Sequence, residues 1–137
     1  MSVCVDASLI IKCLVCETDS DEALAWLSAH EQDELLAPAL IAAEVASVLR
    51  KKVQRGEISE DQAEEALDIF AALDIKLVWD YPLIQRAFRL SCQLDRPNVY
   101  DAVYLALAER ERCDLWTADP RFIHVAAQSY PFIRSLG

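Results

Sequence analysis

The sequence predicts an α/β fold in which a parallel sheet of four to five strands is covered by helices on both faces. Short β-branched or apolar segments alternate along the chain with longer segments whose apolar residues recur at the period of a helix. Strands separated by helices pair in parallel and need cover on both faces of the sheet. No linker, internal repeat or low-complexity tract interrupts the alternation, so residues 1–137 are expected to form a single domain.

The opening segment predicts a strand followed by two helices. Residues 2–5 contain two β-branched valines and are followed directly by turn-forming residues, so they are expected to form the first strand. Ser8 is expected to cap a helix that continues to about Cys16. A second helix is expected over residues 20–30. Its apolar face is predicted to consist of Ala23, Leu24 and Leu27.

The next two helices are predicted by the residues at their ends. After a short second strand over residues 35–37, Pro38 suits the first turn of a helix and Gly56 suits the position just past its end. Ser59 and Gln62 have the spacing of a capping box, which begins the following helix. The apolar residues of the two helices recur with a period of 3.6: Ile41, Val45, Val48, Leu49 and Val53, then Ala63, Ala66, Leu67, Phe70 and Leu73.

The second half of the chain repeats the alternation. Residues 76–79 are expected to form a third strand, and Pro82 begins a helix. That helix is expected to bury Ile84, Ala87, Phe88 and Leu94. Residues 101–112 predict a helix that is apolar nearly all round, as is typical of a helix enclosed by its neighbours. Residues 115–117 predict a fourth strand and residues 132–133 a fifth.

Composition excludes several classes of enzyme. With two glycines in 137 residues, the chain has neither a Gly-rich phosphate loop nor a dinucleotide-binding fingerprint. Its two histidines do not form the paired-histidine helix of zinc proteases, and no nucleophile-elbow pattern is present. The formal net charge is −10, which taken alone argues against binding a polyanion. The same charge is expected if several carboxylates hold divalent cations.

The five cysteines and the N-terminal sequence indicate a cytoplasmic protein. An odd number of cysteines without a signal peptide favours reduced thiols, and no apolar run is long enough to span a membrane. Cys13 and Cys16 have C-x-x-C spacing, which is also found in redox pairs and zinc sites. Because they lie in or beside an apolar run, we interpret them as small, buried helical residues.

Four acidic residues are predicted to meet at one end of the sheet: Asp6, Glu44, Asp101 and Asp119. Ligands of open parallel sheets bind beyond the carboxyl ends of the strands, where these residues are expected. Three of them also have a structural interpretation, since Asp6 suits a turn, Asp101 a helix cap, and Asp119 a turn before Pro120. Glu44 is harder to explain in this way, because it flanks the apolar stripe of its helix, where a half-buried carboxylate without a cation is costly. Four carboxylates without a His or Cys among them favour Mg²⁺ or Mn²⁺ over zinc. Such metal ions are suited to hydrolysing a phosphodiester bond.

The segments that carry these carboxylates resemble a PIN domain, and most closely the VapC-type toxins of toxin–antitoxin pairs. They read Val5-Asp6-Ala7-Ser8, Leu40-Ile41-Ala42-Ala43-Glu44-Val45, Tyr100-Asp101-Ala102-Val103-Tyr104-Leu105-Ala106-Leu107-Ala108 and Leu115-Trp116-Thr117-Ala118-Asp119. The resemblance covers nearly the whole chain and implies a three-layer fold with sheet order 3-2-1-4-5. It also implies a Mg²⁺- or Mn²⁺-dependent endoribonuclease that is a homodimer and is inhibited by a VapB-type antitoxin.

The resemblance assigns roles to six residues. It implies that Asp6, Glu44, Asp101 and Asp119 are the catalytic, metal-binding carboxylates, with Asp119 the least secure because Pro120 follows it. Ser8 and Thr117 match positions that often carry small hydroxyls, and we interpret them as groups that orient a carboxylate or a water. A helix cap and a strand-end residue are their alternative interpretations.

Three basic residues are candidates for contacts with RNA phosphates. Lys51 and Arg55 lie within about 20° of Glu44 around the predicted helix, so they would form a ridge that leads away from the metal site. The alternative is a solvated helix C-terminus favoured by the helix dipole. Arg121, just past Asp119, is the third candidate.

Two other functions compete with the ribonuclease. One is a catalytically silent PIN-like binding module, against which the four intact carboxylates count. The other is a phosphorylation-controlled receiver domain, in which Asp80 would be the phosphoacceptor at the end of the third strand. The receiver also needs an adjacent acidic pair near the first strand and a late lysine, and the sequence has neither.

Overall fold

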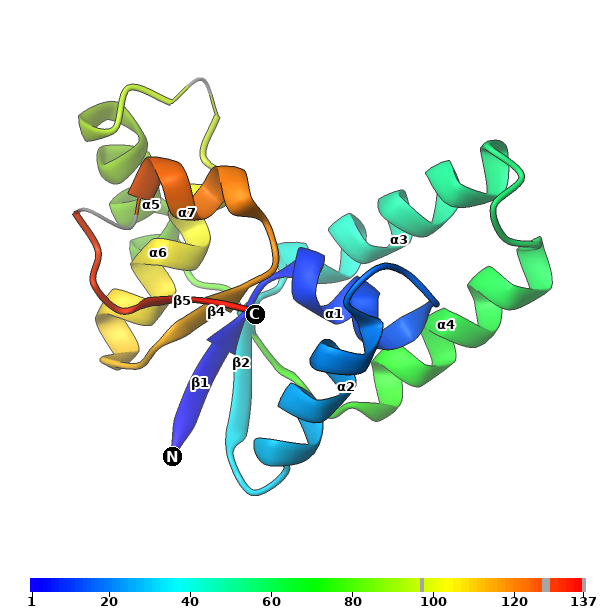
Figure 1. Cartoon of the computed structure of the whole chain (residues 1–137). Coiled ribbons are helices and arrows are strands. Elements are labelled where there is room, and N and C mark those ends of the chain that lie inside the picture. The colour runs from blue at the N-terminus through cyan, green and yellow to red at the C-terminus, as the bar shows by residue number, and fades with distance from the viewer. Residues whose placement is uncertain (97, 127–128, 137) are drawn as a thin grey trace.

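A five-stranded sheet forms the centre of the structure, and helices lie on both of its faces (Figure 1). The structure is a computed structural model and describes residues 1–96, 98–126 and 129–136. The strands are β1 (Ser2–Val5), β2 (Glu34–Pro38), β3 (Lys76–Val78), β4 (Leu115–Thr117) and β5 (Ile133–Ser135). Their order is β3-β2-β1-β4-β5 and every pairing is parallel, as the sequence and its resemblance predict.

The connections between strands place α1 to α4 on one face and α5 to α7 on the other (Figure 1). The helices are α1 (Ala7–Leu14), α2 (Ser20–Ala29), α3 (Leu40–Gln54), α4 (Glu60–Ala72), α5 (Tyr81–Gln93), α6 (Tyr100–Glu111) and α7 (Pro120–Ala126). Figure 1 shows α3 and α4 side by side and extending beyond the sheet. No helix in the described ranges is both long and apolar enough to cross a bilayer.

The strand order creates a switch point between β1 and β4. These neighbours are far apart in the sequence, and Cys4 and Val5 of β1 pair with Leu115 and Trp116 of β4. At a switch point, the segments that follow the two strands run to opposite faces of the sheet. In open α/β sheets, ligands bind in the crevice between these segments at the carboxyl ends of the strands. Asp6 follows β1 directly, and Asp119 lies two residues beyond β4.

Helix α6 confirms the prediction of a helix that is enclosed by its neighbours. All seven residues from Ala102 to Ala108 are buried, and α6 packs against the sheet on one side and α5 on the other. The helix ends were also predicted well in α3 and α4. Gly56 has φ +73° just past α3, where its N–H donates to Val53 and the next N–H donates to Lys52. Ser59 and Gln62 form the predicted capping box.

The structure differs from the prediction in three places: at Pro38, at the two ends of α1, and at α7. Pro38 ends β2 rather than beginning α3, since the N–H that it lacks is not needed at the end of a strand. Asp6, not Ser8, caps α1, and the helix ends at Leu14. Helix α7 was not predicted at all, although a Pro at the first helical position is a known start signal.

Several apolar residues expected in the core are exposed. Leu24, Leu67 and Phe88 have exposed fractions of 49%, 37% and 54%. The buried residues of their helices lie elsewhere: they include Trp26 in α2 and Leu90 in α5, and are Ala63 and Ala66 in α4. Three other residues fall outside the elements predicted for them. Trp79 lies just after β3, Cys16 lies two residues after α1, and Phe132 lies just before β5. Cys16 is therefore exposed rather than buried in a helix.

Candidate functional site

Asp6 is the most buried carboxylate of the site. Its side chain is 5% exposed, and its Oδ1 accepts the backbone N–H of Leu9 at 3.1 Å as the cap of α1. Oδ1 also accepts the hydroxyl of Ser8 at 2.7 Å, and Oδ2 accepts the hydroxyl of Thr117. Burial nevertheless raises the pKa of Asp6 to about 6, because these three hydrogen bonds offset only part of the desolvation and Asp119 adds negative charge.

The two hydroxyls connect the ends of β1 and β4. Ser8 Oγ lies 3.2 Å from Thr117 Oγ1 and accepts the backbone N–H of Ala118 at 3.0 Å. Thr117 Oγ1 accepts the backbone N–H of Asp119 at 3.0 Å. Since Thr117 is fully buried, this network fixes both the Asp6 carboxylate and the backbone that leads to Asp119.

Glu44 reaches the site from the second turn of α3 and is held by Tyr104. The Tyr104 hydroxyl on α6 donates to Glu44 Oε1 at 2.5 Å, and its ring is 2% exposed. Burial raises the pKa of Glu44, the Tyr104 hydrogen bond acts against it, and the charge of Asp101 raises it further. The Tyr104 oxygen also receives a hydrogen bond from the backbone of Ala7, so one side chain links α6, α3 and the start of α1.

Asp101 and Asp119 complete the acidic group from the other side of the crevice. Asp101 lies in the first turn of α6, half-buried, and Val99 rather than Asp101 occupies the cap position. Burial raises the pKa of Asp101 and the charge of Asp119 raises it further, whereas Arg96, whose Nη2 lies 3.8 Å from Oδ2, lowers it. Asp119 Oδ1 accepts the backbone N–H of Arg121 at 2.9 Å at the start of α7.

The four predicted carboxylates are therefore brought to one end of the sheet and act on one another electrostatically. Asp119 raises the pKa values of Asp6 and Asp101, and Asp101 raises that of Glu44. Within the described residues, however, no three acidic, cysteine or histidine side chains form a ready-made set of metal ligands. The carboxylates lie at the same end of the sheet without closing into a cage.

The chemistry of this donor set fits a hard divalent cation. All four side chains offer carboxylate oxygens, which Mg²⁺ and Mn²⁺ prefer. The raised pKa values of Asp6, Glu44 and Asp101 reflect negative charge that is desolvated without full compensation. A bound cation would remove that penalty, and Mg²⁺ commonly binds through one or two carboxylates with waters in its remaining positions.

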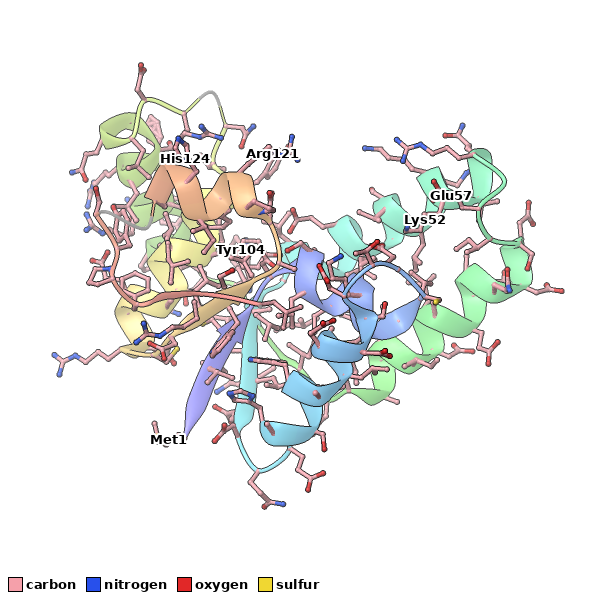
Figure 2. All side chains as sticks on the ribbon, in the orientation of Figure 1. Met1, Lys52, Glu57, Tyr104, Arg121 and His124 are labelled. Atoms are coloured by element: carbon pink, nitrogen blue, oxygen red, sulfur yellow. The ribbon has the colours of Figure 1, made fainter. Side chains whose placement is uncertain are left out.

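The three basic candidates come from the end of α3 and from α7. Lys51 and Arg55 are exposed near the end of α3, whereas Lys52 between them is bound to Glu17 at 3.0 Å and to Glu57 at 3.4 Å (Figure 2). Arg121 on α7 is 93% exposed, and its Nε lies 3.6 Å from Asp119. Figure 2 shows Arg121 above Tyr104, to the left of α3 in the view.

Tyr104 is the residue that sequence reasoning did not single out. It stands three positions after Asp101 in a helix otherwise made mostly of small and aliphatic residues. A buried phenol requires a hydrogen-bond partner for its hydroxyl. The position of Tyr104 in an enclosed helix therefore indicated that its hydroxyl contacts another polar group.

One large cavity lies away from this site. Among the described residues it measures about 800 Å³ and is lined by the end of α2, the start of β2 and the end of α4, including His30, Glu34 and Asp74. It is at the amino-terminal end of the strands and contains none of the four carboxylates. The chemistry of the crevice, rather than its volume, marks the functional site.

Comparison with known proteins gives a consistent result. The family model described as "PIN domain" matches residues 3–128. Ribonuclease VapC3 of Pyrobaculum aerophilum is 37% identical over 123 residues, which cover 87% of this chain and 90% of that protein. Ribonuclease VapC1 of Mycobacterium tuberculosis is 45% identical over 87 residues, and the match spans 62% of each chain.

The fold has a matching solved structure. The crystal structure of VapBC2 from Rickettsia felis, bound to a DNA fragment from its promoter, contains a chain that superposes with a TM-score of 0.73. The match covers all of both chains at 14% sequence identity, so it supports the fold alone.

Proposed function

The chain belongs to the PIN domain family and, within it, to the VapC ribonucleases, and we propose that it is a metal-dependent endoribonuclease and the toxin of a type II toxin–antitoxin module. The observation that carries this proposal is the convergence of Asp6, Glu44, Asp101 and Asp119 at the switch point of the sheet. Those residues come from four separate segments, and their mutual repulsion needs a functional reason.

We assign the metal ions to these four carboxylates. When bound, Mg²⁺ or Mn²⁺ would lower the pKa of the attacking water and stabilise the leaving oxygen of the RNA phosphodiester. Asp6 is held in place by Ser8 and Thr117, and Glu44 is held by Tyr104, so both carboxylates present fixed oxygens to the crevice. Tyr104 is thus a positioning residue.

The RNA strand is proposed to cross the crevice between α3 and α7. Lys51 and Arg55 offer exposed cations along α3, and Arg121 offers one on α7. Contacts of this kind hold phosphates and carry no sequence information. They would also offset the net charge of −10 where the polyanion binds.

The proposed partners follow from the relatives. The superposed chain comes from a complex named VapBC2, which supports a VapB-type antitoxin as the partner of this chain. A homodimer is proposed as well, supported by the exposed aromatic residues Trp79 and Tyr81 beside the edge strand β3.

The receiver interpretation is disfavoured by the sheet order. A receiver domain has its third strand next to the first, whereas β3 here is an edge strand separated from β1 by β2. The Asp80 carboxylate is bound to Arg110 at 2.9 Å and does not join the acidic group.

Cleavage of cellular RNA with Mg²⁺ and with EDTA tests the proposal. We expect cleavage with Mg²⁺, none in EDTA, and a loss of more than about 100-fold in Asp101→Asn. Asp61→Asn, which removes an exposed carboxylate from the first turn of α4, is the matched control and should retain activity. Cleavage in EDTA, or undiminished cleavage by Asp101→Asn, would contradict the mechanism. RNA binding without cleavage would instead support the silent binding module.

A further inference from the structure

Two cysteines that are 109 positions apart in the sequence lie in contact between strand β1 and the loop that joins α6 to β4. The Sγ atoms of Cys4 in β1 and Cys113, just after α6, are 3.5 Å apart. We propose that this pair is a modification site, at which a peroxide converts two thiols into a reversible intramolecular disulfide. The proposal concerns the fold and does not depend on the ribonuclease activity.

The two thiols differ in exposure, which sets the order in which they react. Cys4 is fully buried in β1, whereas Cys113 lies partly exposed in the loop between α6 and β4. A small oxidant therefore reaches the Cys113 sulfur first. Cys4 is placed to resolve the product, since its sulfur already contacts that of Cys113.

The surroundings of Cys113 also favour its reactive form. Its contact with the Cys4 thiol lowers the pKa of Cys113 despite partial burial and the nearby charges of Glu111 and Asp114. Thiolates stabilised in this way, and reachable from solvent, are the ones that oxidise selectively.

The backbone is already arranged for the bond. The N–H of Cys4 donates to the carbonyl of Asp114 at 2.8 Å, and Cys4 pairs with Leu115 in the β1–β4 register. A disulfide is about 2.05 Å long, so the sulfurs need to approach by roughly 1.5 Å. Rotation of the Cys113 side chain in its loop can supply this without a change of strand register.

The reaction balances with hydrogen peroxide as the oxidant. The Cys113 sulfur attacks one peroxide oxygen, the O–O bond breaks, and a sulfenic acid and one water result. The Cys4 sulfur then displaces the hydroxyl group from the Cys113 sulfur, the S–S bond forms, and the Cys4 proton leaves with that hydroxyl as a second water. Two thiols are oxidised and one peroxide is reduced to two waters.

The product would join the two strands from which the site is built. Cys4 lies two residues before Asp6, and Cys113 lies two residues before β4, which carries Thr117. A disulfide between these segments, 109 positions apart in a chain of 137 residues, closes most of the chain into one loop and is expected to stabilise the fold. In a reducing compartment such a bond is transient and reports oxidising conditions.

The test uses a background variant, Cys16→Ser/Cys92→Ser, which removes the two exposed cysteines. This protein and the wild type are treated with hydrogen peroxide and then alkylated under denaturing conditions. We expect two fewer alkylatable thiols in the background variant, a Cys4–Cys113 peptide in the mass spectrum, a melting temperature raised by several degrees, and reversal by dithiothreitol. The matched variant Cys113→Ser in the same background should show none of these changes.

Other products would overturn the proposal. Cys113 oxidised to a sulfinic acid while Cys4 remains alkylatable would exclude Cys4 as the resolving thiol. A disulfide between two chains, or one that involves Cys13, would show that the 3.5 Å contact is not the reactive pair. Peptide mapping of the wild type decides between these results even if Cys113→Ser folds poorly.

Discussion

Two aspartates, Asp6 and Asp80, each follow a strand and cap the next helix, but their surroundings are opposite. Asp6 accepts the N–H of Leu9 at 3.1 Å, and Asp80 accepts the N–H of Leu83 at 2.8 Å. Asp6 is buried among hydroxyls and other carboxylates, and burial raises its pKa to about 6. The Asp80 side chain is 39% exposed, and its hydrogen bond with Arg110 lowers its pKa.

The difference shows that local structure does not identify a functional carboxylate. Both residues satisfy the same helix terminus, so a cap is an equally good explanation for each. What separates them is the compensation of charge, since Asp80 has a guanidinium within 2.9 Å and Asp6 has only neutral donors. An uncompensated, buried carboxylate is the one that a cation would complete.

The largest expected effect separates the two aspartates by activity. Asp6→Asn keeps the cap but removes the charge, and we expect RNA cleavage in Mg²⁺ to fall by about 1,000-fold or more, which corresponds to several kcal/mol of transition-state stabilisation. Asp80→Asn should change cleavage by less than about twofold, within the range of surface substitutions. Circular dichroism checks that both variants are folded. Equal losses of cleavage activity in the two folded variants would show that Asp6 and Asp80 do not differ in function.

A pH dependence of stability should follow from Asp6. Its folded pKa of about 6 lies above the ordinary value of 3.8, so the folded state holds the extra proton between those pH values. Stability of the metal-free protein should therefore fall as pH rises through this window, by up to about 3 kcal/mol for this residue. Urea unfolding in EDTA at pH 4 to 7 measures this change in the free energy of unfolding. Asp6→Asn is the reference, because it lacks the titrating carboxyl group.

The same titration sharpens the comparison when metal is added. Because a cation and a proton compete for the carboxylate, Mg²⁺ should stabilise the wild type more at pH 7 than at pH 5. In Asp6→Asn both the pH dependence and the Mg²⁺ effect should be smaller. A variant that responds to Mg²⁺ as the wild type does would show that Asp6 is not a ligand.

Tyr104→Phe tests whether the hydrogen bond to Glu44 matters for the site. Loss of the hydroxyl should weaken Mg²⁺ affinity by about 10- to 100-fold, as removal of an orienting partner does in metal sites. Calorimetric titration with Mg²⁺ measures this without RNA. Tyr100→Phe, one turn earlier on α6 and 55% exposed, is the matched control and should bind Mg²⁺ normally. Unchanged affinity in Tyr104→Phe would limit that hydroxyl to a structural role.

The smallest effect concerns the cap of α5. Asp80→Ala removes the acceptor of the Leu83 N–H, and the free energy of unfolding should decrease by about 1 kcal/mol. Cleavage should be unaffected, since Asp80 lies outside the acidic group. Urea unfolding and an activity assay on the same sample measure both quantities. A loss of activity larger than the loss of folded protein would connect Asp80 to the site after all.

The same contrast explains which parts of the molecule the sequence predicts. Strand β1 and helix α6 were predicted within a residue of their bounds, because a β-branched run and an all-round apolar helix are each determined by burial. Pro38 and the missed α7 depend on whether proline begins a helix or ends a strand, which local sequence leaves open.

The site was predictable as a set of residue types but not as a network. Strand ends and the resemblance predicted that four carboxylates would meet, and the structure brings these four together, while their catalytic role stays a proposal. The bond between Tyr104 and Glu44 joins residues 60 positions apart, and the bond between Thr117 and Asp6 joins residues 111 positions apart. No periodicity within a segment reports such contacts, and only the packing of α6 against β1 and the pairing of β1 with β4 create them.

The span of that last bond has a consequence for synthesis. Asp6 leaves the ribosome among the first residues, but the hydroxyl of Thr117 that fixes it arrives when most of the chain has been made. Until β4 emerges from the exit tunnel, β1 lacks its neighbour on that side, and the two halves of the acidic crevice are not assembled. Under the proposed function, a nascent chain is therefore expected to leave RNA around its own ribosome uncut until translation of the message is nearly complete.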